Sequence, residues 1–213
     1  MNHLPYQDYQ IINQWIRNGE GHKIDFKTNI SSYPKIAKNI TAFANSLGGR
    51  IVIGVEDKGA VIGVDAVQEK FAIQKAAEEY CKPSIPLIFS KLKYGHKYIL
   101  VAEIKESINK PHFAINEKGE QTLYVRIGDK CVAPPAIIRN FLLAGHLNNL
   151  MRSSNFKNTM KADTEWITAR KEVSLSEFAT QHNLSEKDAL RRLIDYTLDG
   201  GIRIINEQLP SFG

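Results

Sequence analysis

Residues 20–57 read EGHKIDFKTNISSYPKIAKNITAFANSLGGRIVIGVED, and this stretch decides the fold. It opens with a short alternating segment, 22–27, in which Ile24 and Phe26 share one face and charged side chains occupy the other. Such alternation predicts a half-buried strand. Residues 51–55 are apolar throughout, which is typical of a central strand covered on both faces. The stretch therefore predicts two strands that a mixed sheet can place side by side.

A helix is expected between these two strands. Ser32 can cap its first turn, Pro34 fits there, and apolar residues recur at helical spacing as far as Leu47. Gly48 and Gly49 follow at its C-terminal end, where glycine stops helices. A phosphate-binding loop is excluded, because its glycines precede a helix N-terminus and because no Walker sequence occurs in the chain.

The remaining segments predict an α+β fold. Apolar spacing and turn residues indicate helices over about 5–18, 66–81 and 135–150. They indicate strands over about 61–64, 87–94, 97–104, 111–115 and 122–127, the last two as a hairpin. The order is helix, strand, helix and then mostly strands. It predicts a mixed β-sheet with packed helices and not a doubly wound sheet.

The end of the chain predicts a small second domain. We expect an α/β domain over 1–150, a polar linker over 151–161 and a helical domain over 162–213. Ser174 with Glu177 and Ser185 with Asp188 are two capping boxes that open successive helices. Residues 202–205 then follow a glycine pair as a strand. Helix, turn, helix and strand together are typical of a winged helix-turn-helix.

The charge of the chain favours a polyanionic partner. Its 213 residues carry a formal net charge of +5, and the sequence pI is about 9.1. Residues 161–213 hold seven basic and nine acidic residues, a net of −2, so residues 1–160 carry +7. The basic character belongs to the first domain, which is therefore the expected site of contact with nucleic acid.

Membrane and metal-finger classes are excluded by composition. No segment approaches the roughly 18 apolar residues that cross a bilayer, and the N-terminus does not resemble a secretory signal. The two cysteines, Cys81 and Cys131, lack the spacing of zinc ligands. We expect a cytoplasmic protein with reduced thiols and no membrane partner.

Carboxylates flank both strands of the opening stretch. Asp25 and Lys27 share a strand face, Glu20 lies just upstream, and Glu56 and Asp57 follow the buried strand. Two or three carboxylates that converge beside a lysine can hold a divalent metal that activates water near a phosphodiester. The same side chains can instead form a solvated strand face or pair with neighbouring lysines. The residues alone leave both interpretations open.

Two further surfaces are candidates for nucleic-acid contact. Tyr124 and Arg126 share a strand face beside a turn that carries Lys130, which suits base stacking and phosphate binding. The alternative is that the pair simply covers a sheet edge.

The second helix of the C-terminal unit carries Lys187, Arg191 and Arg192, so it could read a DNA groove. Acidic residues on the same helix oppose this role, because phosphate contacts supply much of the affinity for DNA. Docking or dimerisation is the alternative function for this unit.

Five blocks in fixed order resemble the Schlafen AlbA-type domain family. They are Glu20-x4-Asp25-Phe26-Lys27, the segment 42–49, the segment 53–57 with Gly63, the segment 110–113 and the segment 124–128. The resemblance covers about residues 15–145. It implies a nucleic-acid-binding module that is often joined to helix-turn-helix domains in bacterial regulators. Some members are labelled ATP-binding, but this chain has no Walker motif.

The resemblance also implies a second, enzymatic hypothesis. Certain animal members cut transfer and ribosomal RNA with a metal-dependent carboxylate triad. Carried over by motif, the triad corresponds to Glu20, Asp25 and one of Glu56 or Asp57, with Glu20, Asp25 and Asp57 as ligands of Mg²⁺ or Mn²⁺. Asp25 departs from the glutamate that is usual at its position. The animal enzymes combine two such lobes, and a homodimer of this chain could replace the second.

The sequence therefore predicts a nucleic-acid-binding protein, a transcriptional or defence-related regulator, that needs no cofactor to bind DNA or RNA. The alternatives are the metal-dependent ribonuclease and a protein-interaction adaptor. The expected nucleic-acid contacts are Lys27, Lys38, Arg50, Tyr124, Arg126, Lys130, Lys187, Arg191 and Arg192.

Overall fold

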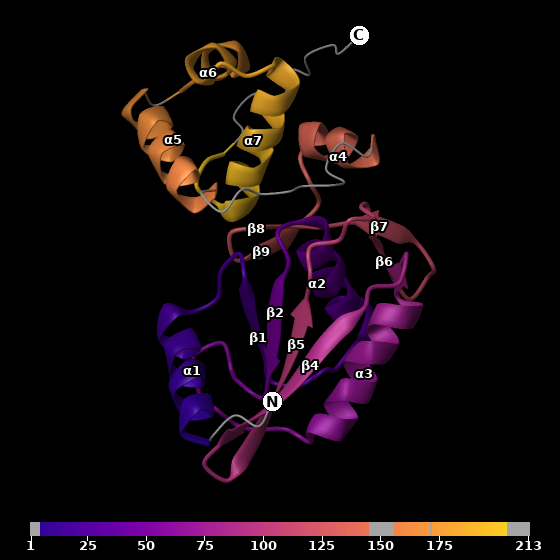
Figure 1. Cartoon of the computed structure of the whole chain (residues 1–213). Coiled ribbons are helices and arrows are strands. Elements are labelled where there is room, and N and C mark those ends of the chain that lie inside the picture. Colours follow the sequence, from indigo (N-terminus) through magenta and orange to yellow (C-terminus); the bar gives the residue numbers. More distant parts are fainter. Residues whose placement is uncertain (1–4, 145–155, 171, 204–213) are drawn as a thin grey trace.

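A four-stranded mixed sheet forms the centre of the computed structural model, which describes residues 5–144, 156–170 and 172–203 (Figure 1). Its strands, in spatial order, are β1 (Ile24–Lys27), β2 (Gly49–Ile53), β5 (Lys97–Ile104) and β4 (Leu87–Tyr94). β1 and β2 are parallel, with Asp25 opposite Ile51. The other two pairings are antiparallel. The mixed α+β sheet predicted from the sequence is thus confirmed.

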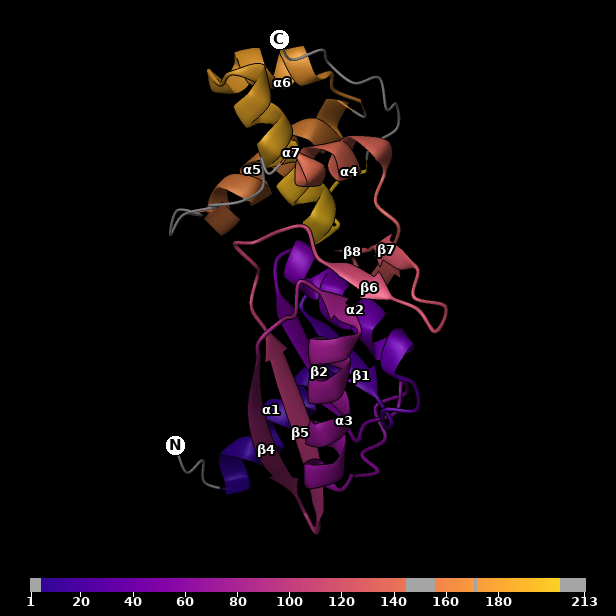
Figure 2. The same ribbon diagram turned by 90° about the vertical axis from the view of Figure 1, so that its right-hand side faces the viewer.

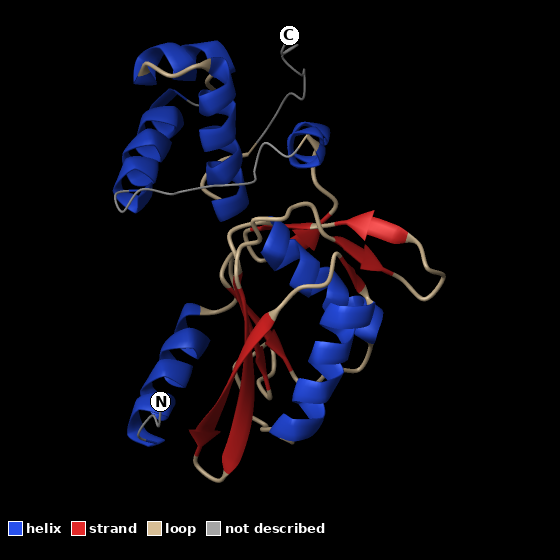
Figure 3. Ribbon diagram, turned by 45° about the vertical axis from the view of Figure 1, so that its right-hand side comes forward, coloured by secondary structure: helices blue, strands red, loops and turns tan. Residues whose placement is uncertain are grey.

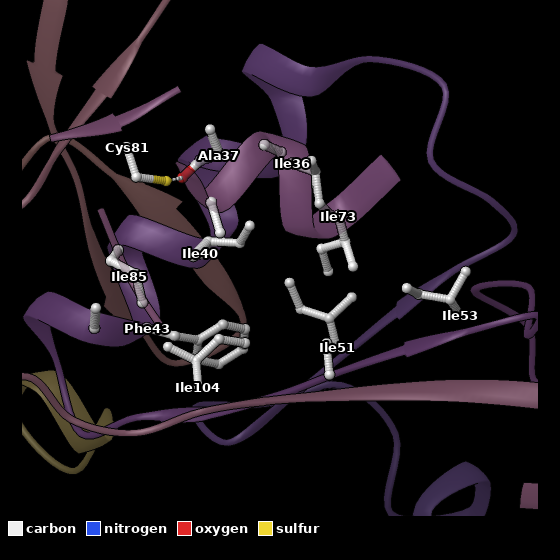
Figure 4. Packing of buried hydrophobic residues seen from close by; sticks show 14 of the residues in the cluster. Ile36, Ala37, Ile40, Phe43, Ile51, Ile53, Ile73, Cys81, Ile85 and Ile104 are labelled. Atoms are coloured by element: carbon white, nitrogen blue, oxygen red, sulfur yellow. Dashed lines mark hydrogen bonds between the residues drawn. The ribbon is translucent and has the colours of Figure 1, made fainter. Parts of the chain in front are cut away.

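Helices cover both faces of this sheet (Figure 3). One face packs against α2 (Tyr33–Asn45) and α3 (Ala66–Glu79), and the other packs against α1 (Pro5–Asn18). Ile51 of β2 packs with Ile40 of α2 and Ile73 of α3 (Figure 4), whereas Val52 packs on the α1 side with Ile12. The apolar run of β2 is therefore buried on both faces, as its composition predicts.

α2 connects the parallel strands β1 and β2, and the residues predicted to bound this helix lie at its two ends. The side chain of Ser32 accepts a hydrogen bond from the backbone N–H of Lys35 at the start of α2. At the other end, a Cβ on Gly48 would lie 2.6 Å from the backbone N of Glu106, and a Cβ on Gly49 would lie 2.4 Å from the Phe43 ring. The glycine pair is needed for close packing and not for a phosphate loop.

Two small sheets follow the main one. The first contains β3 (Cys81–Lys82), β6 (Phe113–Ile115) and β7 (Gln121–Leu123), and the second pairs β8 (Val125–Ile127) with β9 (Lys130–Val132). The hairpin predicted from 111–115 and 122–127 is correct for β6 and β7. The second predicted strand is divided at Tyr124, after which the chain pairs with β9. The strand expected over 61–64 is reduced to one bridge between Val55 and Val61.

Four helices gather at one end of the main sheet, over β8 and β9 (Figures 1 and 2). They are α4 (Ala136–Leu143), α5 (Phe156–Arg170), α6 (Leu175–His182) and α7 (Glu186–Asp199). Of the two predicted capping boxes, the one formed by Ser174 and Glu177 on α6 is present, whereas on α7 Ser185 caps the helix by accepting from the N–H of Asp188 without the reciprocal backbone bond. Among the described residues, no helix is both long and apolar enough to cross a membrane.

The structure changes two expectations for this end of the chain. The segment expected to be a polar linker, 151–161, is helical from Phe156 onward, and 151–155 lie outside the described residues. Ile202 and Arg203 are not in a strand, and the rest of the expected wing, 204–205, lies outside the described residues.

α7 is packed onto the first domain. Leu190, Ile194 and Leu198 share one buried cluster with Val125 of β8 and Ile138 of α4. A contact between His22 Nε2 and Asp199 Oδ1 at 3.1 Å ties the C-terminal end of α7 to the segment that leads into β1. Leu190, Ile194 and Leu198 recur at the spacing that puts them on one face of α7. That face is buried against the first domain.

Candidate nucleic-acid interface

Asp25 is a buried anion that holds three polar partners. The residue is 4% exposed on β1. Its Oδ1 lies 3.1 Å from Nη1 of Arg126, and its Oδ2 lies 2.6 Å from Nζ of Lys27 and accepts a hydrogen bond from Nδ2 of Asn39 at 3.0 Å. Both carboxylate oxygens are therefore engaged. Asp25 and Lys27 do share a strand face, as the alternation predicts, and they are ion-paired on it.

Arg126 corrects the prediction of a surface phosphate contact. It is 1% exposed, its Nε donates to the carbonyl of Gly21 at 2.8 Å, and its Nη2 donates to the carbonyl of Ile24 at 2.9 Å. Its guanidinium also lies 4.6 Å from the centre of the Phe43 ring. The cause is the position of β8 against the start of β1, which turns the side chain inward. Arg126 joins β8 to the start of β1, and four of its five N–H donors are used in these contacts and in one with Sγ of Cys131.

Tyr124 is likewise no open stacking surface. The half-buried ring packs against the core between the sheet and α2, and Nζ of Lys38 lies 4.9 Å from its centre. A half-buried ring that packs on the core and has a lysine near its face is not an open platform for a base. Tyr124 and Arg126 therefore fit the alternative that the sequence left open, a pair committed to packing.

Asn45 and Ser46 are structural residues that the sequence analysis missed. Nδ2 of Asn45 donates to the carbonyls of His112 and Tyr124 at 2.7 and 2.8 Å, and its Oδ1 accepts from the N–H of His112 at 2.7 Å. Oγ of Ser46 accepts from the N–H of Arg126 at 2.8 Å. These contacts join the end of α2 to β6 and β8. The available signal was a pair of polar residues at the end of an otherwise apolar helix face, one residue before the glycine pair.

Among the described residues, Glu20, Asp25 and Asp57 do not form one metal-binding group, although Glu20 lies near enough to Asp25 to be affected by its charge. Oε1 of Glu20 accepts from the N–H of Phe26 at 2.7 Å, on the open edge of β1. Partial burial raises the pKa of Glu20, the Phe26 N–H opposes that rise, and the charge of Asp25 adds to it. Glu56 and Asp57 are exposed in the turn that follows β2.

The predicted metal ligands Glu20, Asp25 and Asp57 are therefore corrected. In the described ranges, no group of three or more histidine, cysteine, aspartate and glutamate side chains could hold a metal ion. The carboxylate oxygens of Asp25 already face two cations and an amide donor. A metal ion would have to displace Lys27 or Arg126, so these residues do not fit the catalytic role that the resemblance implies for them.

A basic cleft lies between α2 and the β8–β9 hairpin, with Asp25 in its lining. Its volume is about 540 Å³. Its charged lining residues are Lys27, Lys35, Lys38, Arg126, Lys130, Asp25 and Asp129. Lys35 and Lys130 are exposed, and Lys27 and Lys38 are partly so. Besides the buried Arg126, three of the predicted contacts, Lys27, Lys38 and Lys130, line this cleft together with Lys35, which was not among the predicted contacts.

The first turn of α2 adds to the positive potential of this cleft. Ser31 and Ser32 line it immediately before the helix. A helix N-terminus carries a partial positive charge and unpaired N–H groups, both of which favour anions. Lysine ammonium groups and a helix start in the same cleft form an environment that suits phosphate.

Arg50 lies away from this cleft, on the α1 side of the sheet. Its guanidinium is 4.9 Å from the centre of the Trp15 ring, and it lines a separate cleft with Glu103. The reason is alternation along β2, because Ile51 faces α2 and its neighbours face α1. Arg50 is therefore not brought together with Lys27, Lys38 and Lys130.

The three basic residues of α7 differ in exposure and in the partners they contact. Lys187 is exposed in the first turn. Nη2 of Arg192 instead lies 2.8 Å from Oδ2 of the buried Asp163, and its Nε donates to the hydroxyl of Tyr196 at 2.7 Å. Arg191 is half-buried. The prediction that this helix presents a basic face to DNA is corrected for Arg192, whose charge is used inside the helical unit.

Comparison with known proteins places this fold in a family. A family model described as Schlafen, AlbA_2 matches residues 20–135, which is more than half of the chain. The chain belongs to the Schlafen AlbA_2 family. The resemblance predicted from the five sequence blocks is confirmed, and family membership gives the chain a nucleic-acid-associated role in coarse terms. The match ends before the helical unit 162–213, so it does not test the winged-helix expectation.

Two solved structures are distant matches of this chain. No curated protein matches the chain. The solution NMR structure of the N-terminal domain of an ATP-dependent DNA helicase RecG-related protein from Nitrosomonas europaea is 18% identical, with a TM-score of 0.44, over 52% of this chain and 81% of that one. The crystal structure of the DIP2311 protein from Corynebacterium diphtheriae is 16% identical, with a TM-score of 0.41, over 72% of this chain and 31% of that one. Similarity at this level carries no argument about function.

The Schlafen AlbA_2 motifs of this chain turn out to be mostly architectural. Besides the Asn45 and Arg126 contacts, Nζ of the buried Lys110 donates to the carbonyl of Ser46 at 3.0 Å and pairs with Glu106 at 2.7 Å. The ring of His112 contacts the Pro83 carbonyl through Nδ1 at 2.8 Å and Oγ of Ser107 through Nε2 at 2.7 Å. The blocks thus fix how β6 and β8 join α2.

The buried His112 predicts a pH dependence of stability. Burial lowers the pKa of His112 below its ordinary value, and the charge of Lys110 lowers it further, while the contact of Nδ1 with the Pro83 carbonyl opposes the shift. The unfolded chain therefore binds the proton more readily. Stability due to this group is fully present above about pH 6.5 and is lost as the pH falls towards the lower folded-state pKa.

Urea unfolding of wild type and His112→Gln at pH 7.5 and pH 5.5 checks this sign. We expect the wild-type midpoint to fall more on acidification than the midpoint of the variant. Equal falls in the two proteins would show that His112 is not the group responsible, because the other titrating residues are common to both.

Proposed function

We propose that this Schlafen AlbA_2 protein binds nucleic acid through the basic cleft between α2 and the β8–β9 hairpin. The observation that carries the proposal is the gathering of Lys27, Lys35, Lys38 and Lys130 around one cleft of about 540 Å³. The ammonium groups of Lys35, Lys38 and Lys130 beside a helix start match the charge of successive phosphates, while the ammonium of Lys27 is paired with Asp25. The basic excess of residues 1–160 supports the same placement.

The chemistry of the lining favours contact with the backbone over contact with bases. None of the described residues that line the cleft is aromatic. Stacking on a tyrosine or tryptophan ring, which is how single-stranded bases are commonly held, is therefore absent from this lining. We infer that recognition is largely independent of base sequence and that it proceeds through phosphates, on DNA or RNA.

Nucleic-acid binding is favoured over phosphodiester cleavage because Asp25 is already paired with two cationic side chains. The residue that the nuclease hypothesis requires as a metal ligand is the buried partner of Arg126 and Lys27. No step of the proposed function passes through a metal or another cofactor. The finer role, a transcriptional or defence-related regulator in the cytoplasm, draws on the family resemblance and stays a prediction.

The helical unit after residue 155 is proposed to dock and not to read a groove. The face of α7 that carries Leu190, Ile194 and Leu198 is buried against the first domain. Asp163 and Tyr196 engage Arg192 inside the helical unit. Only the first turn, with Lys187, is left as an exposed basic position among the residues 187, 191 and 192. This supports the docking alternative for α7 over a recognition helix.

Titration of affinity with salt tests the proposal. Labelled 20-nucleotide DNA and RNA of mixed sequence are bound to the full chain at salt concentrations from about 50 to 300 mM, with fluorescence anisotropy as the readout. Three phosphate contacts predict a slope of log K against log salt of about −3, and scrambling the sequence is expected to change affinity by less than about threefold. EDTA should change nothing.

A slope near zero would contradict contact through phosphates. The absence of binding at about 50 mM salt, where this electrostatic attraction is strongest, would contradict the proposed function as a whole.

A further inference from the structure

The outer edge of the main sheet at β4 is open over residues 87–91, before Asp8 of α1 covers it at Lys93. β4 is the end strand of the sheet, on the side opposite to β1 (Figure 2). The N–H of Lys93 donates to Oδ2 of Asp8 at 3.0 Å and so points away from β5. Because outward and inward backbone groups alternate, Leu87, Phe89 and Lys91 also point theirs outward. None of these three outward N–H groups has a partner among the described residues.

Exposed apolar side chains lie next to this edge. Val67 and Phe71, one turn apart on α3, are 78% and 69% exposed, and Ile88 on β4, which faces the α1 side of the sheet, is 46% exposed. An open strand edge beside large exposed hydrophobic side chains is costly for a monomer, since it templates pairing with another chain. Such a surface is typical of an interface.

A groove of about 480 Å³ runs between α3 and β4, and its charges are self-complementary. Lys70, Gln74 and Glu78 line it from one face of α3, and Leu87 and Phe89 line it from β4. Nζ of Lys70 lies 5.2 Å from the centre of the Phe89 ring. One end of the helix face is thus basic and the other end, two turns later, is acidic. Two antiparallel copies of this face match lysine to glutamate twice.

We propose that two copies of this chain pair through their β4 edges, antiparallel, about a two-fold axis at Phe89. Leu87 of one copy then faces Lys91 of the other, and the two sheets join into one. The same axis sets the α3 helices antiparallel, so that Lys70 of each copy faces Glu78 of the other. An interface of this kind uses the same patch on both subunits, which is the commonest arrangement of a dimer.

This dimer leaves the basic clefts free. They lie beside β1 and α2, at the edge of the sheet remote from β4, so pairing through β4 covers neither. The dimer would present two separate phosphate-binding clefts to a nucleic acid. Because oligomeric state is measured without nucleic acid, failure of this proposal and failure of the proposed function are distinguishable.

A charge exchange on α3 tests the interface. Sedimentation velocity of the full chain over about 1 to 100 µM is expected to show a monomer–dimer equilibrium. Lys70→Glu should raise the dissociation constant by about tenfold or more, because it places glutamates opposite each other. Adding Glu78→Lys to the same chain should restore the wild-type value. Lys118→Glu, in an exposed turn between β6 and β7, is the matched control and should change nothing.

A backbone variant tests the strand pairing separately. The N–H of Lys91 is not used by the β4–β5 ladder, so Lys91→Pro removes an interface donor from an edge strand that can hold proline. Its circular dichroism should match the wild type while the dimer is lost. A wild type that stays monomeric at about 100 µM would overturn the proposal. So would a dimer that neither Lys70→Glu nor Lys91→Pro weakens.

Discussion

Replacing Asp25 with alanine is expected to lower the free energy of unfolding by about 3–5 kcal/mol. The variant leaves Arg126, which is 1% exposed, without its carboxylate partner, and it removes the ion pair of Lys27 at the same point. A buried cation that loses its partner retains the full cost of desolvation, which is why breaking a buried pair destabilises more than the pair itself contributes.

Urea unfolding followed by circular dichroism measures this loss, and three variants calibrate it. Asp57→Ala changes an exposed carboxylate and should shift stability by less than about 0.5 kcal/mol. Asp25→Asn keeps the shape and an acceptor for Asn39, so its cost should be intermediate. Lys27→Met combined with Asp25→Ala should recover part of the loss, because one of the two orphaned cations is gone.

The same measurement separates a structural Asp25 from a metal-binding one. A carboxylate that serves as a metal ligand beside Glu20 is repelled by its neighbour, so its removal leaves stability unchanged or raises it. An unchanged unfolding midpoint for Asp25→Ala would therefore contradict the anchor role. It would restore the metal-dependent hypothesis for this carboxylate.

Local pattern was sufficient to predict the central sheet and its crossover. Alternation gave β1, continuous apolarity gave β2, and caps with glycine stops bounded α2 between them. Each of these signals depends on neighbours within a few residues in the sequence, so packing far along the chain does not alter it. The same holds for β4, β5 and the caps of α6 and α7.

The burial of Arg126 could not be predicted from local sequence pattern. Its partner Asp25 lies about a hundred positions earlier, and alternation only says that Arg126 and Tyr124 share a face, not what that face meets. The division of the strand at Tyr124 has the same cause, because Asn45 binds the Tyr124 carbonyl from the distant end of α2. A charged side chain with an apolar neighbour on each side is compatible with both solvent and a buried counter-ion.

Strand register explains why the predicted carboxylate triad does not form. Asp25 pairs with Ile51 in the parallel ladder, and Asp57 lies in the turn beyond the end of β2. The sequence showed both carboxylates near the strands but not that one lies within the ladder and the other past its end. On α7, by contrast, the signal was present. Leu190, Ile194 and Leu198 recur at helical spacing, and that stripe indicated docking more strongly than the adjacent basic residues indicated DNA.

The second large effect is expected on binding. Replacing Lys35, Lys38 and Lys130 together with alanine should lower affinity for a 20-nucleotide DNA or RNA by on the order of 100-fold at about 0.1 M salt, and should reduce the salt slope by about 3. Each of these lysines lines the cleft without an ion pair to a described carboxylate, so its charge is available to a phosphate. Lys27 is left in place, because its ammonium is paired with Asp25 and its loss would confuse binding with folding.

A control triple with the same change in charge decides whether position or net charge matters. Lys58, Lys82 and Lys118 are exposed and lie outside the cleft lining. Long-range attraction depends on total charge, so the control should lose only a few-fold, mainly through slower association. Removing Lys38 from the Tyr124 ring costs about 0.5–1 kcal/mol of stability, which thermal unfolding of the cleft triple would register separately. Equal losses of affinity in the two triple variants would mean that nucleic acid is attracted by the whole basic domain. That result would contradict the cleft as the binding site.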